Sequence, residues 1–253
     1  MKTLALINEI KDMEEILAEA IKFNNTVLEV LFVHEEEFFE LPDLFKPKFE
    51  QDENIDKESI KKEILKNLAN LNYKKDVAIF VYINDTFSRV ESLVKDNKTL
   101  IVTKYNSATK ELADSEEKIL FLKRAQHNYQ TILVELALDG EDNKRINFAK
   151  ELFPNTNLIL AYDYQHFITV DMSTVDPMMG MNSDPYLDEE LKEQNKKTFN
   201  QILKESGLTG VFLEDTGVAE SLIEYVNSEA DLAILKQRDN DILKKIIKDC
   251  LFV

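Results

Sequence analysis

The segment Val81-Tyr-Ile-Asn-Asp-Thr86 returns about 130 residues later as Val211-Phe-Leu-Glu-Asp-Thr216, and this repeat decides the fold. Similar pairs of segments flank it on both sides in the same order. Chance rarely preserves order over so many segments, so we interpret the chain as a tandem duplication joined near residues 123–128. The predicted domains are residues 1–124 and 128–253. The further pairs are 90–94 with 219–223, 99–102 with 231–234, 28–33 with 158–162, and 3–7 with 131–134.

The composition excludes several classes of protein. The chain has 253 residues, of which 44% are hydrophobic and 31% charged, values typical of a globular protein and not of a disordered chain or a fibre. Its net charge of -17 would be repelled by nucleic acid and by anionic membranes. A single cysteine, Cys250, allows no intramolecular disulfide. No apolar run is long enough for a membrane span or a signal peptide. We therefore expect a cytoplasmic protein without nucleic-acid or membrane partners.

Each half alternates short apolar runs with segments of helical periodicity. Strands that are apolar on both faces and alternate with helices indicate a parallel sheet covered on both sides. Right-handed crossovers then give each half an open, doubly wound, five-stranded parallel sheet of the α/β class with helices on both faces. Asp85 or Thr86 is expected to cap a helix. The predicted strands are 4–7, 27–33, 77–83, 100–103 and 119–122, then 131–136, 157–162, 210–213, 232–235 and 251–253; the predicted helices are 13–21, 60–71, 87–94 and 107–116, then segments around 146–152, 191–202, 218–226 and 242–247.

The pattern resembles a tandem universal stress protein. The residues that carry this resemblance are Thr131–Val134 followed by the Asp139-Gly140 turn and a helix containing Ala149, and the run from Asp215 to Ile234. The resemblance implies two Rossmann-like domains of the adenine-nucleotide α-hydrolase type and a role in the stress response. Domains of that family pair through their last strands, so the resemblance also implies an internal pseudo-dimer of the two halves.

The sequence departs from the family at the phosphate-binding loop. ATP-binding members carry a GxxG stretch after the fourth strand, followed by a glycine and a serine or threonine, and neither half of this chain has it. The first of only five glycines is Gly140, which also excludes Walker A and dinucleotide-binding turns from the first half. Asn106-Ser107 stands where the family's glycine-serine pair would be. It could offer a hydroxyl and a helix N-terminus to an anion, and the same residues could simply cap a helix.

The family's adenine-contacting aspartate has no settled counterpart. Counting along the second half places Ala137 there, with Asp139 available only if the turn carries an insertion, and the first half offers Glu9. Asp139-Gly140 is equally typical of an ordinary turn. If a nucleotide is bound, the candidate residues are therefore Asn106, Ser107, Asp139 and Gly140, and the cofactor is ATP or AMP with magnesium.

Histidine and cysteine indicate neither a metal site nor a catalytic site. His34, His127 and His166 lack the spacing of metal ligands. His34 and His166 follow the second strand of their halves and could touch a ligand or simply be polar strand ends. Cys250 is expected to be buried packing. Carboxylates are abundant but follow no recognisable spacing, and no nucleophile stands in a known catalytic motif. We therefore predict no catalytic residue.

Two long connections occupy the same place in each half. Residues 35–56 mix an acidic run with four phenylalanines, and residues 167–187 hold four methionines. Connections of this length often form lids or interaction surfaces, and methionine adapts to irregular apolar partners. Alternatively, these side chains simply cover the open end of each sheet.

The leading hypothesis is a non-enzymatic, universal stress protein-like protein that acts through an unidentified protein partner and needs no cofactor; a homodimer is also allowed. The alternative is a regulator that still binds ATP or AMP, with slow hydrolysis at most. An enzyme built on the wider nucleotide hydrolase-like fold is the third hypothesis.

Overall fold

The computed structural model describes most of the chain in two compact units, built from Met1–His127 and Asn128–Leu251, with the last two residues falling one to each unit. Most of each long connection, residues 36–55 and 167–184, lies outside the described residues, and so do the predictions made for them. The described residues are 2–23, 27–35, 56–94, 99–115, 117–124, 127–166, 185–215, 219–236 and 240–253.

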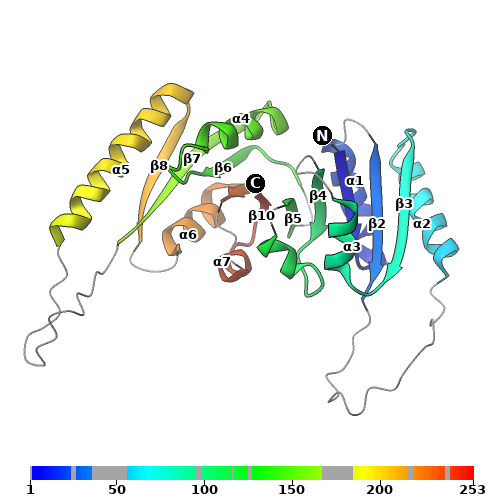
Figure 1. Cartoon of the computed structure of the whole chain (residues 1–253). Coiled ribbons are helices and arrows are strands. Elements are labelled where there is room, and N and C mark those ends of the chain that lie inside the picture. The colour runs from blue at the N-terminus through cyan, green and yellow to red at the C-terminus, as the bar shows by residue number, and fades with distance from the viewer. Residues whose placement is uncertain are drawn as a thin grey trace, which may run out of the picture. The chain divides into compact units, whose positions relative to one another are not determined.

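The first unit contains a five-stranded sheet in the order β3-β2-β1-β4-β5, with every neighbouring pair parallel (Figure 1). The order reverses between β1 and β4, so the chain passes from one half of the sheet to the other at that point. The elements are β1 Lys2–Ile7, η1 Ile10–Asp12, α1 Met13–Phe23, β2 Leu28–His34, α2 Lys57–Asn70, β3 Val77–Ile83, α3 Thr86–Leu93, β4 Thr99–Lys104, η3 Lys110–Asp114 and β5 Lys118–Leu122.

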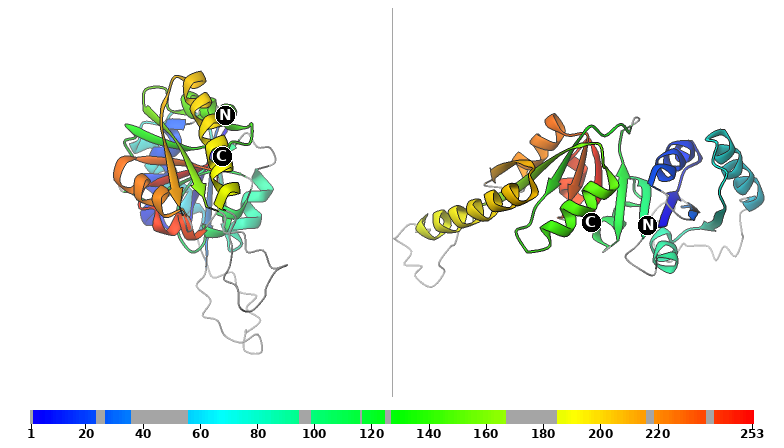
Figure 2. Two further views of the ribbon diagram at one scale, coloured as in Figure 1. Left: turned by 90° about the vertical axis from the view of Figure 1, so that its left-hand side faces the viewer. Right: turned by 90° about the horizontal axis from the view of Figure 1, so that it is seen from above.

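The core of this unit lies on both faces of the sheet. The side chains from Leu4 to Ile7 in β1 are fully buried, which requires cover on each side. Helices α1 and α2 pack against each other on one face, and α3 lies on the other (Figure 2). The buried side of α1 repeats at helical spacing and consists of Met13, Ile16, Leu17, Ala20 and Phe23.

The second unit repeats the topology, with the strand order β10-β9-β6-β7-β8 (Figure 1). β6 pairs in parallel with β7 and β9, and β7 with β8. The predicted fold class, a doubly wound parallel α/β sheet in each half, is confirmed. The elements are β6 Thr131–Glu135, α4 Asp142–Leu152, β7 Asn157–Gln165, α5 Pro185–Ser206, β8 Thr209–Asp215, α6 Glu220–Glu229, β9 Leu232–Leu235, α7 Asn240–Lys245 and β10 Asp249–Phe252.

Several predicted elements differ from the structure in type or bounds, among them η3, β7 and α7. The helix predicted at 107–116 is only the 3-10 helix η3, because Asn106 accepts from the N–H groups of Ala108 and Thr109, and the Thr109 hydroxyl donates to Lys104 O, which holds 106–109 as a turn. β7 runs to Gln165, three residues beyond its predicted end, since its polar residues continue to pair with β8. The last helix, α7, ends two residues before its predicted end at 247. Cys250 is buried in β10, as expected.

Candidate functional site

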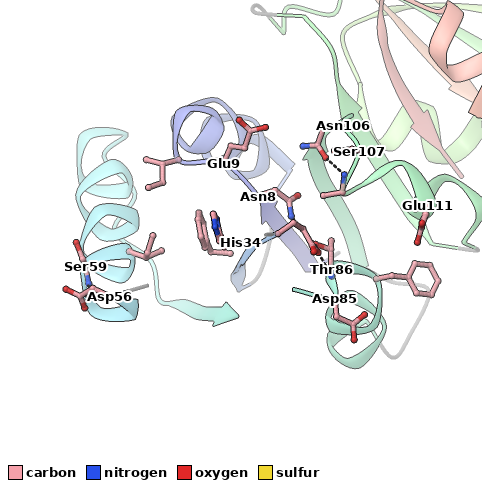
Figure 3. Close-up of a pocket in the computed structure, with 16 residues that line it drawn as sticks. Asn8, Glu9, His34, Asp56, Ser59, Asp85, Thr86, Asn106, Ser107 and Glu111 are labelled. Atoms are coloured by element: carbon pink, nitrogen blue, oxygen red, sulfur yellow. Dashed lines mark hydrogen bonds between the residues drawn. The ribbon is translucent and has the colours of Figure 1, made fainter. Parts of the chain in front are cut away.

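A cavity of about 1160 Å³ opens in the first unit where the strand order reverses. Its wall comes from the residues that follow β1, β2 and β4 and from the first turns of α2 and α3. Figure 3 shows Asn8 in the middle of this wall, with Asp56 and Ser59 of the α2 start on one side and Asn106 and Ser107 on the other. The cavity therefore lies where the sheet topology places ligand sites.

A chain of hydrogen bonds fixes the wall between β1 and α3. Asn8 Nδ2 donates to Val33 O and to Thr86 Oγ1, both at 3.0 Å. Thr86 in turn donates its backbone N–H, at 2.8 Å, and its hydroxyl, at 2.5 Å, to Glu35 Oε1. Asn8 and Thr86 are buried and Glu35 is half-buried, so this network links β1, β2 and α3 where hydrogen bonds are only partly exposed to water.

Carboxylates of the chain cap both helices that begin at the cavity. Asp85, in the left-handed region at φ 68°, accepts from the N–H of Ser88 and caps α3, which confirms one of its two predicted caps. Asp56 accepts from the N–H groups of Glu58 and Ser59 and caps α2. With Glu35 on Thr86, the amides that a helix N-terminus offers to an anion already have carboxylate partners here.

In the loop after β4, backbone N–H groups also donate to a side chain of the protein itself. Asn106 Oδ1 accepts from the N–H groups of Ala108, at 2.9 Å, and Thr109, at 3.1 Å. The Thr109 hydroxyl donates to Lys104 O at 2.6 Å. Ser107 is exposed on the cavity wall. The structure thus places both predicted residues at the cavity, and the amide of Asn106 caps the turn at 107–109, not the N-terminus of a helix as its alternative interpretation had it.

The cavity wall is acidic. Among the described residues that line it, none is lysine or arginine. Glu9 forms an exposed ion pair with Lys11, whose side chain is not part of the wall. Like charges brought together in a partly desolvated space repel, so this wall disfavours a polyphosphate. The carboxylates are Glu9, Glu35, Asp56, Asp85 and Glu111.

Asp139 and Gly140 lie in the other unit, in the turn between β6 and α4. Asp139 Oδ1 accepts from the Glu141 N–H at 3.0 Å, and Oδ2 lies 3.5 Å from both Arg145 and Lys236. Burial raises the pKa of Asp139, but that hydrogen bond and the two cations outweigh it and lower the pKa overall. Gly140 has φ 86°, which the turn needs. These contacts are those of a structural turn.

Three carboxyl groups gather on the face of the second sheet that α6 covers. Glu135 and Asp215 are buried, and they accept from the backbone of Lys236 and from Ser221 of α6, respectively. Burial, followed by contact with Asp215 and the charge of Glu135, raises the pKa of Asp163 to about 7, although Gln165 opposes it. The neighbouring carboxylates thus favour the protonated form of Asp163.

The sequence missed Asn8, Thr86 and Glu35 as a connected group. Their signal was available, because each directly follows or begins an element at the carboxyl edge of the sheet. His34 lines the same cavity, whereas His166 follows β7 in the second unit and lies 3.6 Å from Glu214. Within the described ranges, no three His, Cys, Asp or Glu side chains are arranged to hold a metal ion.

Known proteins of the same fold cover almost the whole chain. A protein from Pseudomonas aeruginosa described as a candidate universal stress protein aligns over 100% of this chain and 92% of its own, with a TM-score of 0.62 and 14% identity. A universal stress protein from Archaeoglobus fulgidus aligns over 99% and 95%, with a TM-score of 0.59 and 13% identity. A functionally unknown protein from Pseudomonas aeruginosa aligns over 100% of this chain and 92% of its own, with a TM-score of 0.58 and 13% identity. The chain therefore has a universal stress protein-like fold.

The likeness lies in structure alone. The sequence matches no protein family and no curated protein. No helix in the described part of the chain is long and apolar enough to cross a bilayer.

Proposed function

We propose that the chain is a non-enzymatic, universal stress protein-like regulator that acts by contacting another protein and does not bind the phosphates of ATP. One observation carries the proposal: at the cavity of the first unit, backbone amides suited to an anion already donate to Glu35, Asp56, Asp85 and Asn106. A phosphate would have to displace these side chains. It would also have to enter a wall without lysine or arginine among its described residues.

The same arrangement argues against catalysis. The hydroxyls at the cavity are Thr86, which is committed to Glu35, and the exposed Ser59 and Ser107. Glu35 lies within hydrogen-bond reach of the Thr86 hydroxyl, but this hydroxyl is buried and held between Asn8 and Glu35, so it is not presented to a substrate. We therefore keep the proposal of a protein that is not an enzyme.

The biological setting is proposed from the likeness of fold. A role in the stress response, a cytoplasmic location and pairing of the two halves as an internal pseudo-dimer all belong to this proposal. The partner contacts the long connections, whose aromatic and methionine-rich composition suits an adaptable surface.

A specific observation favours the second candidate, an ATP- or AMP-binding regulator. The cavity is large enough for a nucleotide and lies at the switch in strand order. In that case the base and ribose would occupy the cavity, and Asn106 and Ser107 would have to release their present contacts to reach the phosphates.

Thermal unfolding of the full chain separates the two candidates. A ligand that binds only the native state raises the unfolding temperature by mass action. We expect no shift with millimolar ATP, AMP or either nucleotide with magnesium. A clear upward shift that saturates with nucleotide concentration would overturn the proposal and favour the nucleotide-binding regulator.

A further inference from the structure

The outer edge of β3 lacks the features that usually protect an edge strand. β3 is the terminal strand of the first unit, and among the described strands it pairs only with β2 (Figure 1). Its sequence, VAIFVYI, contains no charged residue, proline or glycine, and every side chain except Val81 is half-buried. Proteins usually protect such an edge with charges, proline or a bulge, because an apolar edge invites another strand to pair with it.

The backbone of this edge is oriented for pairing. The N–H of Asn84 donates to His34 O of β2 at 2.8 Å, so Asn84 faces β2. Successive residues of a strand turn their N–H and C=O groups to opposite sides, so alternate residues of β3 turn theirs away from β2. No described strand meets these groups. They belong to Val77, Ile79, Val81 and Ile83.

The equivalent edge of the second unit is protected. β8 is also a terminal strand, but it carries Glu214 and Asp215. Glu214 is exposed and pairs with Lys192 of α5 at 2.8 Å, and Lys196 of the same helix lies 6.0 Å from the ring centroid of Phe212. Charges thus guard β8. Because the two strands hold the same position in the same topology, this difference singles out β3 as the edge left open to pairing.

A second, independent observation comes from α2. Helix α1 packs against β1 and β4, and α2 packs against β3, so the side of α2 away from α1 borders the free edge. Asn67 Nδ2 lies 3.4 Å from Met13 Sδ, which marks the side of α2 that faces α1. At about 100° per residue, Leu65 lies about 160° around the helix from Asn67. Leu65 is 50% exposed, so the border of the free edge carries an exposed apolar side chain.

A second copy of the chain fits this edge by symmetry. Outward-facing residues must meet outward-facing residues for strands to exchange hydrogen bonds. An antiparallel pair with its two-fold axis at Phe80 meets this condition and pairs all seven residues of both strands. Every side chain then lies beside an apolar one. The opposed residues that exchange hydrogen bonds are Val77 with Ile83 and Ile79 with Val81.

Charges at the two ends of the strand support the same register. Lys75 precedes β3 and Asp85 follows it, and both are exposed. The two-fold axis brings Lys75 of one copy to the strand end at which Asp85 of the other copy lies, and the contact recurs at the opposite end. The same axis leaves both α2 helices on one face of the joined sheet, with Leu65 of each on the side of the other copy.

We propose that the chain forms a homodimer in which the β3 edges of two copies pair as antiparallel strands and Leu65 contributes to the contact. The inference goes beyond the proposed function and does not rest on it, because the β3 edge and α2 carry it whatever the cavity binds.

Sedimentation velocity of the full chain over about a hundredfold range of concentration tests the inference, at about 150 mM NaCl, where repulsion between the acidic copies is screened. We expect a reversible shift from monomer to dimer. Ile79→Pro removes an outward N–H, which an edge strand tolerates, and it should weaken the dimer at least tenfold while the variant folds, as judged by circular dichroism. A folded variant that dimerises like the wild type would overturn the inference.

Leu65→Gln leaves the strand untouched. It should weaken the dimer roughly fivefold, because it removes apolar surface buried between the copies. The matched control is Leu191→Gln, which changes an exposed leucine of α5, the helix that precedes β8. This control should dimerise like the wild type. Equal weakening by the two variants would contradict a contact at α2.

Phe80→Cys tests the register. The two-fold axis passes at Phe80, so the two sulfurs face each other and mild oxidation should give a disulfide-linked dimer. Tyr82→Cys is the control, since Tyr82 lies opposite Ala78 of the other copy and should not cross-link. Cys250 is buried and does not compete. Equal cross-linking of the two variants would overturn the register. A chain that stays monomeric at every concentration would leave the edge to a strand of another protein and overturn the homodimer.

Discussion

The two units use the same topology but treat the carboxyl edge of their sheets differently. At the end of β1, where the second unit has Glu135 at the end of β6, the first unit has the buried, apolar Ile7, and its polar groups form the wall of an open cavity beyond the strands. On the face that α6 covers, the second unit buries Glu135 and Asp215 within the strands themselves. The two units thus share a scaffold but differ in the chemistry of its edge, which is what a scaffold with separable site residues permits.

The charges of the two edges differ as well. The described cavity wall of the first unit holds carboxylates without lysine or arginine, whereas in the second unit Arg145 and Lys236 lie beside Asp139. In the second unit each of these charges lies beside an opposite charge. In the first unit, backbone amides and the exposed Lys11 compensate only part of the negative charge of the wall. This difference leads to the following predictions, from the largest expected effect to the smallest.

Arg145→Met should cause the largest loss. Arg145 is buried and lies 2.7 Å from Asp142, which is 2% exposed, so the substitution leaves a buried carboxylate without its cation. We expect the free energy of unfolding to fall by about 3 kcal/mol, measured by urea denaturation. Lys144→Met is the control, since its pair with Glu141 is exposed, and it should change stability by less than about 0.5 kcal/mol. Equal losses of stability in the two variants would show that the stability of the second unit does not depend on the ion pair of Arg145 with Asp142.

Thr86→Val tests the hydrogen bonds that join Asn8, Thr86 and Glu35 in the first unit. Valine keeps the shape of threonine but removes the hydroxyl that links Asn8 to Glu35. Because the amide of Asn8 is buried, we expect a loss of about 2 kcal/mol in the same assay. Ser88→Ala, in the same helix but exposed, should be nearly neutral. A neutral Thr86→Val would mean that the network does not hold the cavity wall.

Asn106→Ala separates capping from ligand binding. The substitution removes the oxygen that accepts from Ala108 and Thr109, and loss of such a cap costs about 1 kcal/mol. Ser107→Ala, exposed and beside it, should leave stability unchanged. If both variants are as stable as the wild type, Asn106 is free for a ligand and its capping role is wrong.

The last prediction is a pH dependence of stability that comes from Asp163 in the second unit. The folded-state pKa of Asp163 is raised from 3.8 to about 7, so the folded protein binds this proton more tightly than the unfolded chain. The resulting stability is fully present below about pH 4 and is lost as the pH rises to about 7. Asp163→Asn should remove this contribution, which is read from urea denaturation at several pH values in that window. An unchanged dependence of stability on pH in the variant would contradict the raised pKa of Asp163.

Much of the fold could be predicted because apolar runs report strands directly. β3 and β9 begin and end at the predicted residues, and the α3 cap at Asp85 was one of two expected. The end of β7 was missed because Asp163 and Gln165 are polar, and only tertiary contact with β8 keeps them in a strand. Local hydrogen bonding by Asn106 overrode the helix predicted after it.

The site was predicted in part. The rule that ligands bind at the switch in strand order places Asn106 and Ser107 at the cavity, where the structure has them. The contact between Asn8, Thr86 and Glu35 joins residues up to 78 positions apart, and such a network depends on packing that no local pattern reveals. Asp139 and Gly140 occupy a turn in the other unit, and their role toward a nucleotide stays a prediction.

The central claim is that the chain's own side chains occupy the amides that phosphates would need. The most direct test is to denature the purified full chain and quantify any released adenine nucleotide by chromatography. The account predicts no nucleotide above a trace, because Glu35, Asp56 and Asp85 already accept from amides at the cavity and the described wall holds no lysine or arginine. Close to one adenine nucleotide per chain would contradict it.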